Sequence, residues 1–266
     1  MNKQPEDLNL LDFLAKTHYF IQIVKPEKPE KPIAFGSGFF IEYNSHHFFL
    51  TADHNIHIED HKLNERTGID NNVEIFNNIS DKENFRTIVT PIGGFYYMEK
   101  FDIIKPNDAP ELFDVALSLI DIKKLQAPFL TDDNIVSSNG EQLVTPGEPK
   151  LMFTEILLVE PTLVDKYFVF GKIRPYFQGL FLHRKFTLKE NITFIGEFGD
   201  YLLFNSDAEI RDYDDWAGLS GSPMVNQNGE CVGVLCSIIE NSKSLWVKPL
   251  SKIKPLLDIA ILQKDK

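Results

Sequence analysis

Three short segments carry residue types that together could activate a hydroxyl nucleophile. One apolar run ends at His54, and Asp114 opens a second apolar run. Ser220 lies in the segment Gly-Leu-Ser-Gly-Ser-Pro, with glycines on both sides. A serine hydroxyl is a poor nucleophile at neutral pH and needs a base to remove its proton. The imidazole of His54 can act as that base, because the usual pKa of histidine lies near 6.5.

Asp114 and the glycine at position 218 would complete such a site. A buried carboxylate holds the imidazole in the correct tautomer and stabilises its protonated form. The charge that develops on a substrate carbonyl oxygen needs fixed donors, each worth about 3–4 kcal/mol in comparable sites. Glycine permits the backbone conformation that would aim the N–H groups of Gly218 and Ser220 at one point. We therefore predict a triad of His54, Asp114 and Ser220, with an oxyanion hole from Gly218 and Ser220.

The order and surroundings of these segments resemble those of chymotrypsin-like (trypsin-fold) serine peptidases of a compact bacterial or intracellular type. Residues 50–54 are similar to the histidine motif of that family, residues 114–117 to its aspartate motif, and residues 218–223 to its serine motif. Gly-Ser-Gly-Phe at 36–39 is similar to a strand pair of bacterial members. The resemblance extends from about Tyr19 to Lys252 and implies a serine endopeptidase that works through an acyl-enzyme.

Three positions depart from the pattern of the family. Leu219 stands where digestive members have an aspartate that pairs with a newly cut N-terminus, so that kind of activation is not expected. Ser222 replaces the commoner second glycine. Asp53 stands where alanine is frequent, and its carboxylate either raises the pKa of His54 or points to solvent.

Other residues of the same types compete for the catalytic roles. His57 is the strongest rival for the base, although we interpret it as structural together with His18, His46, His47, His61 and His183. The rivals of Asp114 are Asp102, Asp108 and Asp121, whose sequence contexts fit the motif less well.

The resemblance also implies where the substrate binds. The base of the family's specificity pocket lies about six residues before the nucleophile, which falls on Asp214. A carboxylate there would favour a basic residue before the scissile bond, whereas the competing interpretation places Asp214 in an acidic surface loop. The strand that holds Cys236, Ser237 and Ile238 resembles the one that pairs with the substrate backbone. The large side chain of Ile238 would narrow the pocket.

Many short strands with turn residues between them, and helices only near the ends, predict an all-β chain. We expect two six-stranded antiparallel β-barrels of the chymotrypsin-like kind, with a short N-terminal helix and a C-terminal helix. The predicted parts are an N-terminal helical arm at 1–18, a first barrel at 19–130 and a second barrel at 131–266. Leu151–Val159 is predicted to be a strand, and the proline-rich segment Lys25–Pro32 an extended surface loop.

Charge and cysteine content exclude several classes of partner. The formal net charge is -12, so no basic footprint for nucleic acid or anionic lipid is visible. No apolar run reaches the about 18 residues of a membrane-spanning helix. Cys231 and Cys236 lie about 16 Å apart in an extended strand, too far for a disulfide. Free thiols and the lack of a secretory signal lead us to expect a cytoplasmic protein.

The main functional alternative is a catalytically inactive trypsin-fold module that serves binding or scaffolding. An esterase of the α/β-hydrolase kind is excluded because no histidine follows His183, whereas that fold places its histidine after the serine. No metal-binding spacing occurs, and no cofactor is expected. The expected partners are a polypeptide substrate and a regulatory sensor protein, since similar bacterial peptidases act as regulated effectors in stress or defence.

Overall fold

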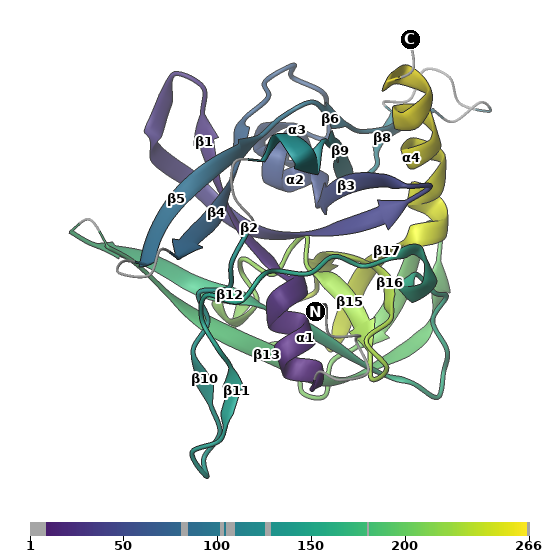
Figure 1. The fold of residues 1–266 in the computed structure, drawn as a ribbon. Helices are drawn as coiled ribbons and strands as arrows, with labels where there is room; N and C mark the ends of the chain where they lie inside the picture. Colours follow the sequence, from purple (N-terminus) through teal and green to yellow (C-terminus); the bar gives the residue numbers. More distant parts are fainter. Residues whose placement is uncertain are drawn as a thin grey trace.

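The computed structural model describes residues 9–80, 85–101, 104, 110–125, 129–179 and 181–264. Asp102, Asp108 and the first eight residues of the predicted N-terminal arm lie outside the described residues. Figure 1 shows two β-layers, the upper one built from the first half of the chain and the lower one from the second.

The first half of the chain forms a seven-stranded half-barrel sheet with the strand order β5-β4-β1-β2-β3-β9-β6. All neighbouring strands of this sheet run antiparallel. The strands are β1 (Tyr19–Lys25), β2 (Lys28–Tyr43), β3 (His46–Thr51), β4 (Asn72–Ser80), β5 (Phe85–Ile92), β6 (Phe95–Tyr96) and β9 (Ala116–Ile120). Phe, Ile and Val are frequent in β1 to β3, and such side chains pack well on a pleated surface.

The second half forms a closed antiparallel barrel with the order β12-β13-β14-β17-β16-β15. Its strands are β12 (Lys166–Gln178), β13 (Phe181–Phe198), β14 (Tyr201–Asn205), β15 (Pro223–Asn226), β16 (Cys231–Ile238) and β17 (Ser244–Pro249). Residues of β14 alternate between buried and partly exposed positions, as expected for a strand with one face toward a barrel interior.

Helices and short hairpins complete the fold. The helices are α1 (Leu10–Thr17), α2 (Asp53–Ile56), α3 (Ile58–Leu63) and α4 (Leu250–Lys264), and the 3-10 turns are η2 (Ile122–Lys124), η3 (Glu155–Leu157) and η4 (Tyr213–Asp215). The short pairs are β7 (Glu99–Lys100) with β8 (Glu111–Leu112), and β10 (Ile135–Val136) with β11 (Gln142–Val144). Helix α1 begins at Asn9, whose side chain accepts a hydrogen bond from the backbone N–H of Asp12 at 2.8 Å.

The predicted fold class is confirmed, since the strands fit a two-barrel chymotrypsin-like arrangement with a helix near each end. The second barrel has the expected six strands, whereas the first half forms a seven-stranded half-barrel sheet in place of a closed six-stranded barrel. The expectation that helices occur only near the ends is wrong, because α2 and α3 follow β3 directly. The strand predicted at Leu151–Val159 is also wrong: the segment is irregular and contains η3, although Phe153 pairs with β2 through a single bridge. The prolines of Lys25–Pro32 do not keep this segment out of the sheet, since β2 begins at Lys28 and pairs with β1 across two register shifts.

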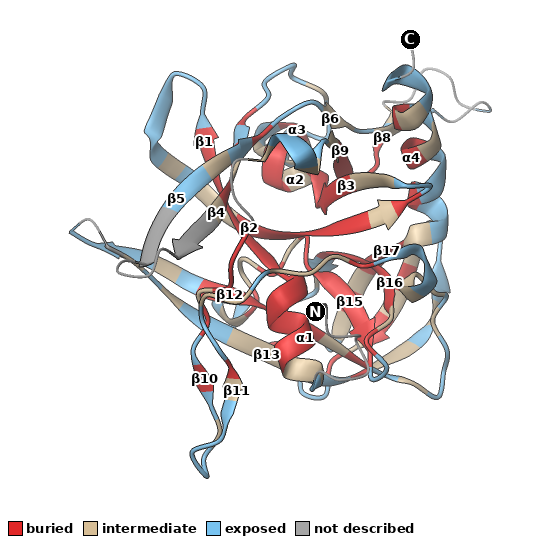
Figure 2. Cartoon of the chain, in the orientation of Figure 1, coloured by how far each residue is buried: buried red, intermediate tan, exposed pale blue. Residues whose placement is uncertain are grey.

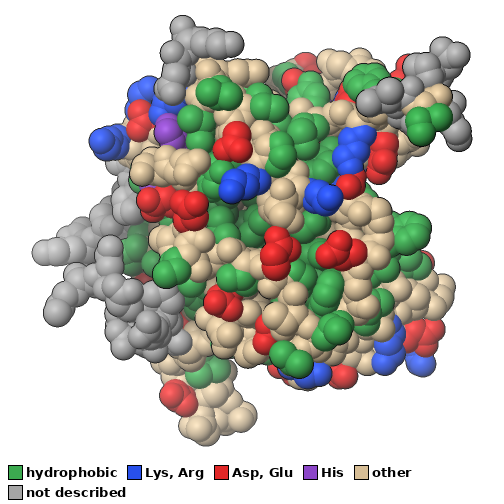
Figure 3. All heavy atoms as spheres, turned by 90° about the vertical axis from the view of Figure 1, so that its right-hand side faces the viewer, with side chains coloured by type: hydrophobic (Ala, Val, Ile, Leu, Met, Phe, Trp, Pro, Cys, Tyr) green, Lys and Arg blue, Asp and Glu red, His purple; other side chains and the backbone are tan. Residues whose placement is uncertain are grey.

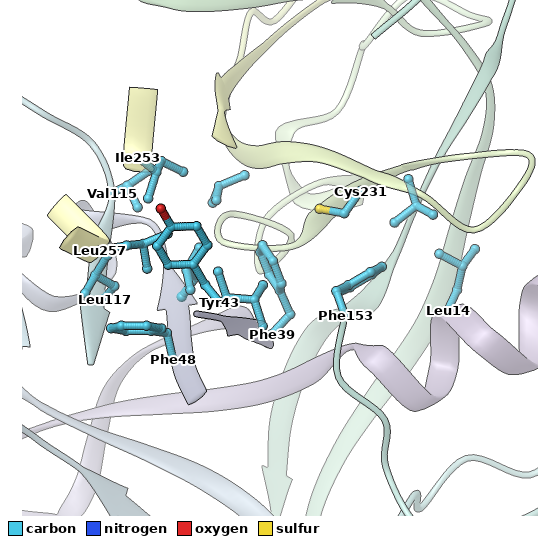
Figure 4. Packing of buried hydrophobic residues seen from close by; sticks show 14 of the residues in the cluster. Leu14, Phe39, Tyr43, Phe48, Val115, Leu117, Phe153, Cys231, Ile253 and Leu257 are labelled. Atoms are coloured by element: carbon cyan, nitrogen blue, oxygen red, sulfur yellow. The ribbon is translucent and has the colours of Figure 1, made fainter. Parts of the chain in front are cut away.

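A continuous apolar cluster joins the two β-layers. It contains Phe39 and Leu117 from the half-barrel, Cys231 from the barrel, Leu14 from α1 and Leu257 from α4. Figure 4 shows these side chains meeting between the strands, and Figure 2 shows that buried residues concentrate where the two layers face each other. Separate apolar clusters fill the half-barrel and the barrel. Burial of this shared surface fixes how the layers sit against one another.

Both cysteines are free and buried, as the strand geometry predicts. On the face that carries α4, acidic and basic side chains are interspersed with apolar ones (Figure 3). None of the helices in the described part of the chain combines the length and apolar character that crossing a membrane would require.

Candidate active site

The register of two neighbouring strands brings His54 and Asp114 together. Strands β3 and β9 pair antiparallel, with Thr51 opposite Ala116. His54 lies three residues after Thr51, and Asp114 lies two residues before Ala116, so both leave the sheet at the same end. Helix α2 begins one residue before His54, directly after the end of β3.

Asp114 holds both the backbone and the ring of His54. Its Oδ1 atom accepts from the backbone N–H of His54 at 3.0 Å, and both carboxylate oxygens lie 2.9 Å from His54 Nδ1. A carboxylate can only accept here, so Nδ1 carries the proton and Nε2 presents a lone pair. The Asp114 side chain is 12% exposed and the His54 side chain 30% exposed, so the ring can reach a bound substrate.

Neighbouring carboxylates set the charge state of His54. Burial by itself lowers the pKa of His54, but the charge of Asp114, its hydrogen bond and the charge of Asp53 together raise that pKa above 6.5. Asp53 is fully buried and does not point to solvent. Burial raises the pKa of Asp53, but hydrogen bonds from His57 and His61 and the charge of Arg66 outweigh it and hold the pKa at about 2. Asp53 therefore stays ionised beside the base.

Ser220 lies in the loop between η4 and β15, and both β-layers hold this loop. The Ser220 carbonyl accepts from the backbone N–H of Ser37 and from Asn55 Nδ2, both at 3.0 Å. The next residue, Gly221, donates its N–H to the Leu235 carbonyl at 2.8 Å. Gly221 has a φ of +90°, and a Cβ atom there would lie 2.0 Å from the Ser37 carbonyl oxygen. Only glycine allows this close approach of the two layers.

His54, Asp114 and Ser220 line one pocket of about 230 Å³. The Ser220 hydroxyl donates to the Cys236 carbonyl at 3.5 Å, and no hydrogen bond between Ser220 and His54 occurs among the described residues. Catalytic hydrogen bonds are often long before substrate binds and tighten in the complex. The arrangement thus brings a hydroxyl, an imidazole and a carboxylate to one cavity.

The backbone N–H groups of Gly218 and Ser220 donate to no acceptor in the described part of the chain, whereas the N–H groups of Leu219 and Gly221 both donate to carbonyls. Gly218 has a φ of +100°, which other residues rarely adopt, and a Cβ there would meet the Lys172 carbonyl oxygen at 2.8 Å. These two free donors, which lie two residues apart, are available to an anionic oxygen.

The predicted substrate-binding residues divide into two groups. Cys236, Ser237 and Ile238 line the pocket. Asp214 does not line it: this residue is exposed on η4, while Tyr213 directly before it and Trp216 two residues after it contribute to the wall. The structure therefore gives Asp214 the position of a surface residue rather than that of a pocket base.

Leu219 is fully buried in the apolar cluster of the closed barrel. A buried leucine has no charged group with which a new N-terminal amine could pair. Apolar burial, and not an ion pair, holds Leu219 in position directly before Ser220.

The sequence interpretation missed His61. This histidine lines the pocket, and its Nε2 atom lies 2.8 Å from Asp53 Oδ2 and 3.8 Å from Asp114 Oδ1. The spacing of Asp53, His57 and His61 at intervals of four residues is a helical signal in the sequence. In the structure His57 separates α2 from α3, and both histidines still bond to Asp53. The rival residues lie elsewhere: His57 is buried and bonded to Asp53 and Asp70, and Asp121 caps η2.

Among the described residues, no group of three or more His, Cys, Asp or Glu side chains is placed to hold a metal ion. The geometry is that of a general base, its orienting carboxylate and a hydroxyl nucleophile beside free backbone donors.

Solved structures of two proteases are similar to this chain. The serine endoprotease from Yersinia pestis has a TM-score of 0.47 and 16% sequence identity, with 98% of this chain and 68% of that chain covered. The Rv3671c protease from M. tuberculosis, in its active form, has a TM-score of 0.45 and 14% identity, with 94% of this chain and 82% of that chain covered. No protein-family model and no curated protein matches the sequence. The roles of the site residues therefore rest on the geometry of this chain alone.

Proposed function

We propose that this chain is a serine endopeptidase that cleaves polypeptides through an acyl-enzyme. The observation that carries the proposal is the single pocket lined by Ser220, His54 and Asp114, with Asp114 bonded to Nδ1 of His54. That contact leaves Nε2 of His54 unprotonated and ready to accept the proton of Ser220.

In the first half of the reaction, Ser220 Oγ forms a bond with the carbonyl carbon of the scissile peptide while its proton passes to His54 Nε2. The free N–H groups of Gly218 and Ser220 donate hydrogen bonds to the carbonyl oxygen and stabilise the negative charge that develops on it. The C–N bond then breaks, and His54 returns the proton to the departing amine. Asp114 stabilises the imidazolium between these two transfers.

In the second half, His54 takes a proton from a water molecule whose oxygen attacks the acyl carbon. Collapse of this intermediate breaks the bond to Ser220 Oγ, which regains the proton from His54. The products are a carboxylic acid and an amine, and the enzyme returns to its starting state.

The end of β16 is suited to hold an extended peptide. Strand β15 begins opposite Val234, so Cys236, Ser237 and Ile238 extend beyond the residues that β15 pairs. A substrate backbone could add to this free edge and place its carbonyl beside Ser220.

Digestion of a mixed peptide library, with the new termini identified by mass spectrometry, tests the proposal. We expect cleavage at defined positions, and none by the Ser220→Ala protein. Intact peptides after prolonged incubation with folded wild-type protein would favour the inactive binding module instead. The role of a regulatory sensor protein stays a prediction from the sequence.

We expect cleavage after apolar residues rather than after lysine or arginine. Tyr213, Trp216, Leu235 and Ile238 form the apolar part of the pocket wall, and the one carboxylate in that wall, Asp114, is bonded to His54. Changing Ile238 to glycine enlarges the pocket, so kcat/KM for large aromatic residues should rise about tenfold to a hundredfold relative to alanine or valine. Peptides that differ only before the scissile bond measure this ratio.

Asp214→Asn is the matched control for the specificity prediction. Because Asp214 is exposed and outside the pocket, this change should leave the residue preference unaltered. Efficient cleavage after lysine by the wild type, lost in Asp214→Asn, would instead establish Asp214 as the base of the pocket.

The pH profile should show the raised pKa of His54. The base acts only when unprotonated, and the surrounding carboxylates keep it protonated up to a higher pH than usual. The acid limb of kcat/KM should therefore reach its half-maximal value above pH 6.5, when measured with a peptide that does not titrate in this range. A limb centred at or below pH 6.5 would mean that Asp114 and Asp53 do not act on His54 as the geometry indicates. NMR titration of His54 gives an independent value for comparison.

A further inference from the structure

A chain of hydrogen bonds links the end of α1 to the loop that carries Ser220. The Ser37 hydroxyl donates to the Gly218 carbonyl at 2.6 Å, and His18 Nε2 lies 2.8 Å from the same hydroxyl oxygen. The backbone N–H of Ser37 also donates to the Ser220 carbonyl at 3.0 Å. Ser37 thus contacts both residues whose N–H groups would form the oxyanion hole.

The number of available protons determines which group donates in each of these hydrogen bonds. A serine hydroxyl has one proton, and Ser37 gives it to Gly218, so His18 must donate from Nε2. Burial and the charges of Lys150, Lys172 and Arg184 hold the pKa of His18 well below its usual value, so the ring is neutral. Nδ1 of His18 has no partner in the described part of the chain, which agrees with a ring that donates only from Nε2.

The surroundings hold His18 firmly in this position. Its side chain is fully buried and packs edge-on against Phe170, with ring centroids 5.6 Å apart. Its backbone carbonyl accepts from Lys150, which also donates to the Ala15 carbonyl at 2.9 Å. Gly171 makes room for the contact, since a Cβ there would lie 3.2 Å from His18 Nε2 and 2.5 Å from Leu219.

We propose that His18 is a positioning residue for the oxyanion loop, acting through Ser37 on Gly218. The glycine at 218 is free to adopt several backbone conformations, so something outside the loop must select the one with both N–H groups available. Hydrogen bonds from Ser37 to the Gly218 and Ser220 carbonyls select it, and His18 orients the Ser37 hydroxyl. Docking of α1 is thereby coupled to the activity of Ser220. This inference rests on the proposed endopeptidase function.

Substitution of His18 by leucine tests the proposal, with kcat and KM measured separately. We expect kcat to fall about tenfold to a hundredfold. The loss of one oxyanion donor in comparable sites lowers kcat by about a hundredfold or more, and a displaced donor should cost no more than a lost one. KM should change by no more than about twofold, because the oxyanion contact is made in the transition state. His18→Gln keeps a donor near the position of Nε2 and should recover most of the lost rate.

Ser37→Ala removes the middle member of the chain and should lower kcat to a similar extent. The double variant H18L/S37A should be no slower than either single variant, because the two residues act on one contact. Multiplied effects in the double variant would overturn the proposal. If H18L does not fold, the smaller change S37A tests the proposal on its own. A folded S37A protein with wild-type kcat would also overturn the proposal.

Thr17→Val is the matched control for a purely structural effect. Thr17 is buried in the same helix, next to His18, and its hydroxyl donates only to the Phe13 and Leu14 carbonyls of α1. We expect T17V to lower the melting temperature but to keep kcat. If T17V and H18L lower kcat equally, His18 stabilises the helix and does not position the loop. A wild-type protein without any activity would contradict the endopeptidase function and this inference together, whereas active wild type with unaltered variants contradicts the inference alone.

Discussion

Replacing Ser220 with alanine is expected to lower kcat by a factor on the order of 10⁵ to 10⁶, leaving only the contribution of substrate binding and the oxyanion donors. The variant keeps the backbone of the loop, including the contacts of the Ser220 carbonyl with Ser37 and Asn55. Stability and substrate affinity should therefore change little. Kinetics with a chromogenic peptide and a thermal melt of the same preparation measure the two effects.

Ser222→Ala provides the matched control for the loss of the nucleophile. Ser222 lies two residues further along the loop, is fully buried, and its hydroxyl has no partner among the described residues. Most of the activity should survive that change. Retention of activity by Ser220→Ala would exclude Ser220 as the nucleophile. Equal losses of activity in both variants would mean that activity depends on the conformation of the loop and not on the Ser220 hydroxyl itself.

Asp114→Asn is expected to lower kcat about 10⁴-fold with little change in the fold. The Asp114 carboxylate accepts from both the backbone N–H and Nδ1 of His54. An asparagine can keep its oxygen on the backbone N–H, but its NH₂ group then faces Nδ1. The proton of the ring must move to Nε2, and His54 loses the lone pair that would accept the proton of Ser220.

The control for this change is Asp121→Asn, which also tests the rival aspartate. Asp121 caps η2 by accepting from the backbone N–H of Lys123, away from the pocket. We expect wild-type kcat from D121N. A large loss in D121N together with full activity in D114N would reverse the two assignments. The pH profile of D114N adds a second readout, because loss of the charge should move the acid limb to lower pH.

The placement of His54, Asp114 and Ser220 at one pocket could be predicted from the sequence, because each of these residues lies in a local pattern. His54 and Asp114 flank apolar runs that form β3 and β9, and the pairing of Thr51 with Ala116 makes those ends neighbours. Ser220 lies between glycines whose conformations the loop requires. Such patterns depend on residues close in sequence, and the apolar runs beside His54 and Asp114 do form strands β3 and β9.

Specificity could not be predicted in the same way, because counting residues assumes a loop of fixed shape. The six-residue offset selects Asp214, but η4 leaves this residue exposed and lets its neighbours Tyr213 and Trp216 reach the pocket. A shift of one or two residues along a 3-10 turn is enough to place aromatic side chains, and not a carboxylate, in the wall of the pocket.

Long-range polar contacts could not be predicted from the sequence pattern either. The His18–Ser37 bond joins residues 19 apart, and the Ser37–Gly218 bond joins residues 181 apart. Nothing in either segment marks its partner, since these contacts arise only when the apolar cluster brings the two layers together. Helices α2 and α3 were missed for a related reason: each is short, and such helices depend on tertiary contacts more than on local propensity.

Labelling by a fluorophosphonate probe is the most direct test of the central claim that His54 and Asp114 activate Ser220. The probe forms a covalent bond with an activated serine, and mass spectrometry of the digested protein locates the modified residue. We expect one label per folded chain, on Ser220, absent after denaturation and absent in Ser220→Ala, with slow labelling in Asp114→Asn. Folded wild-type protein that takes up no label, or that carries it on another residue, would contradict the claim.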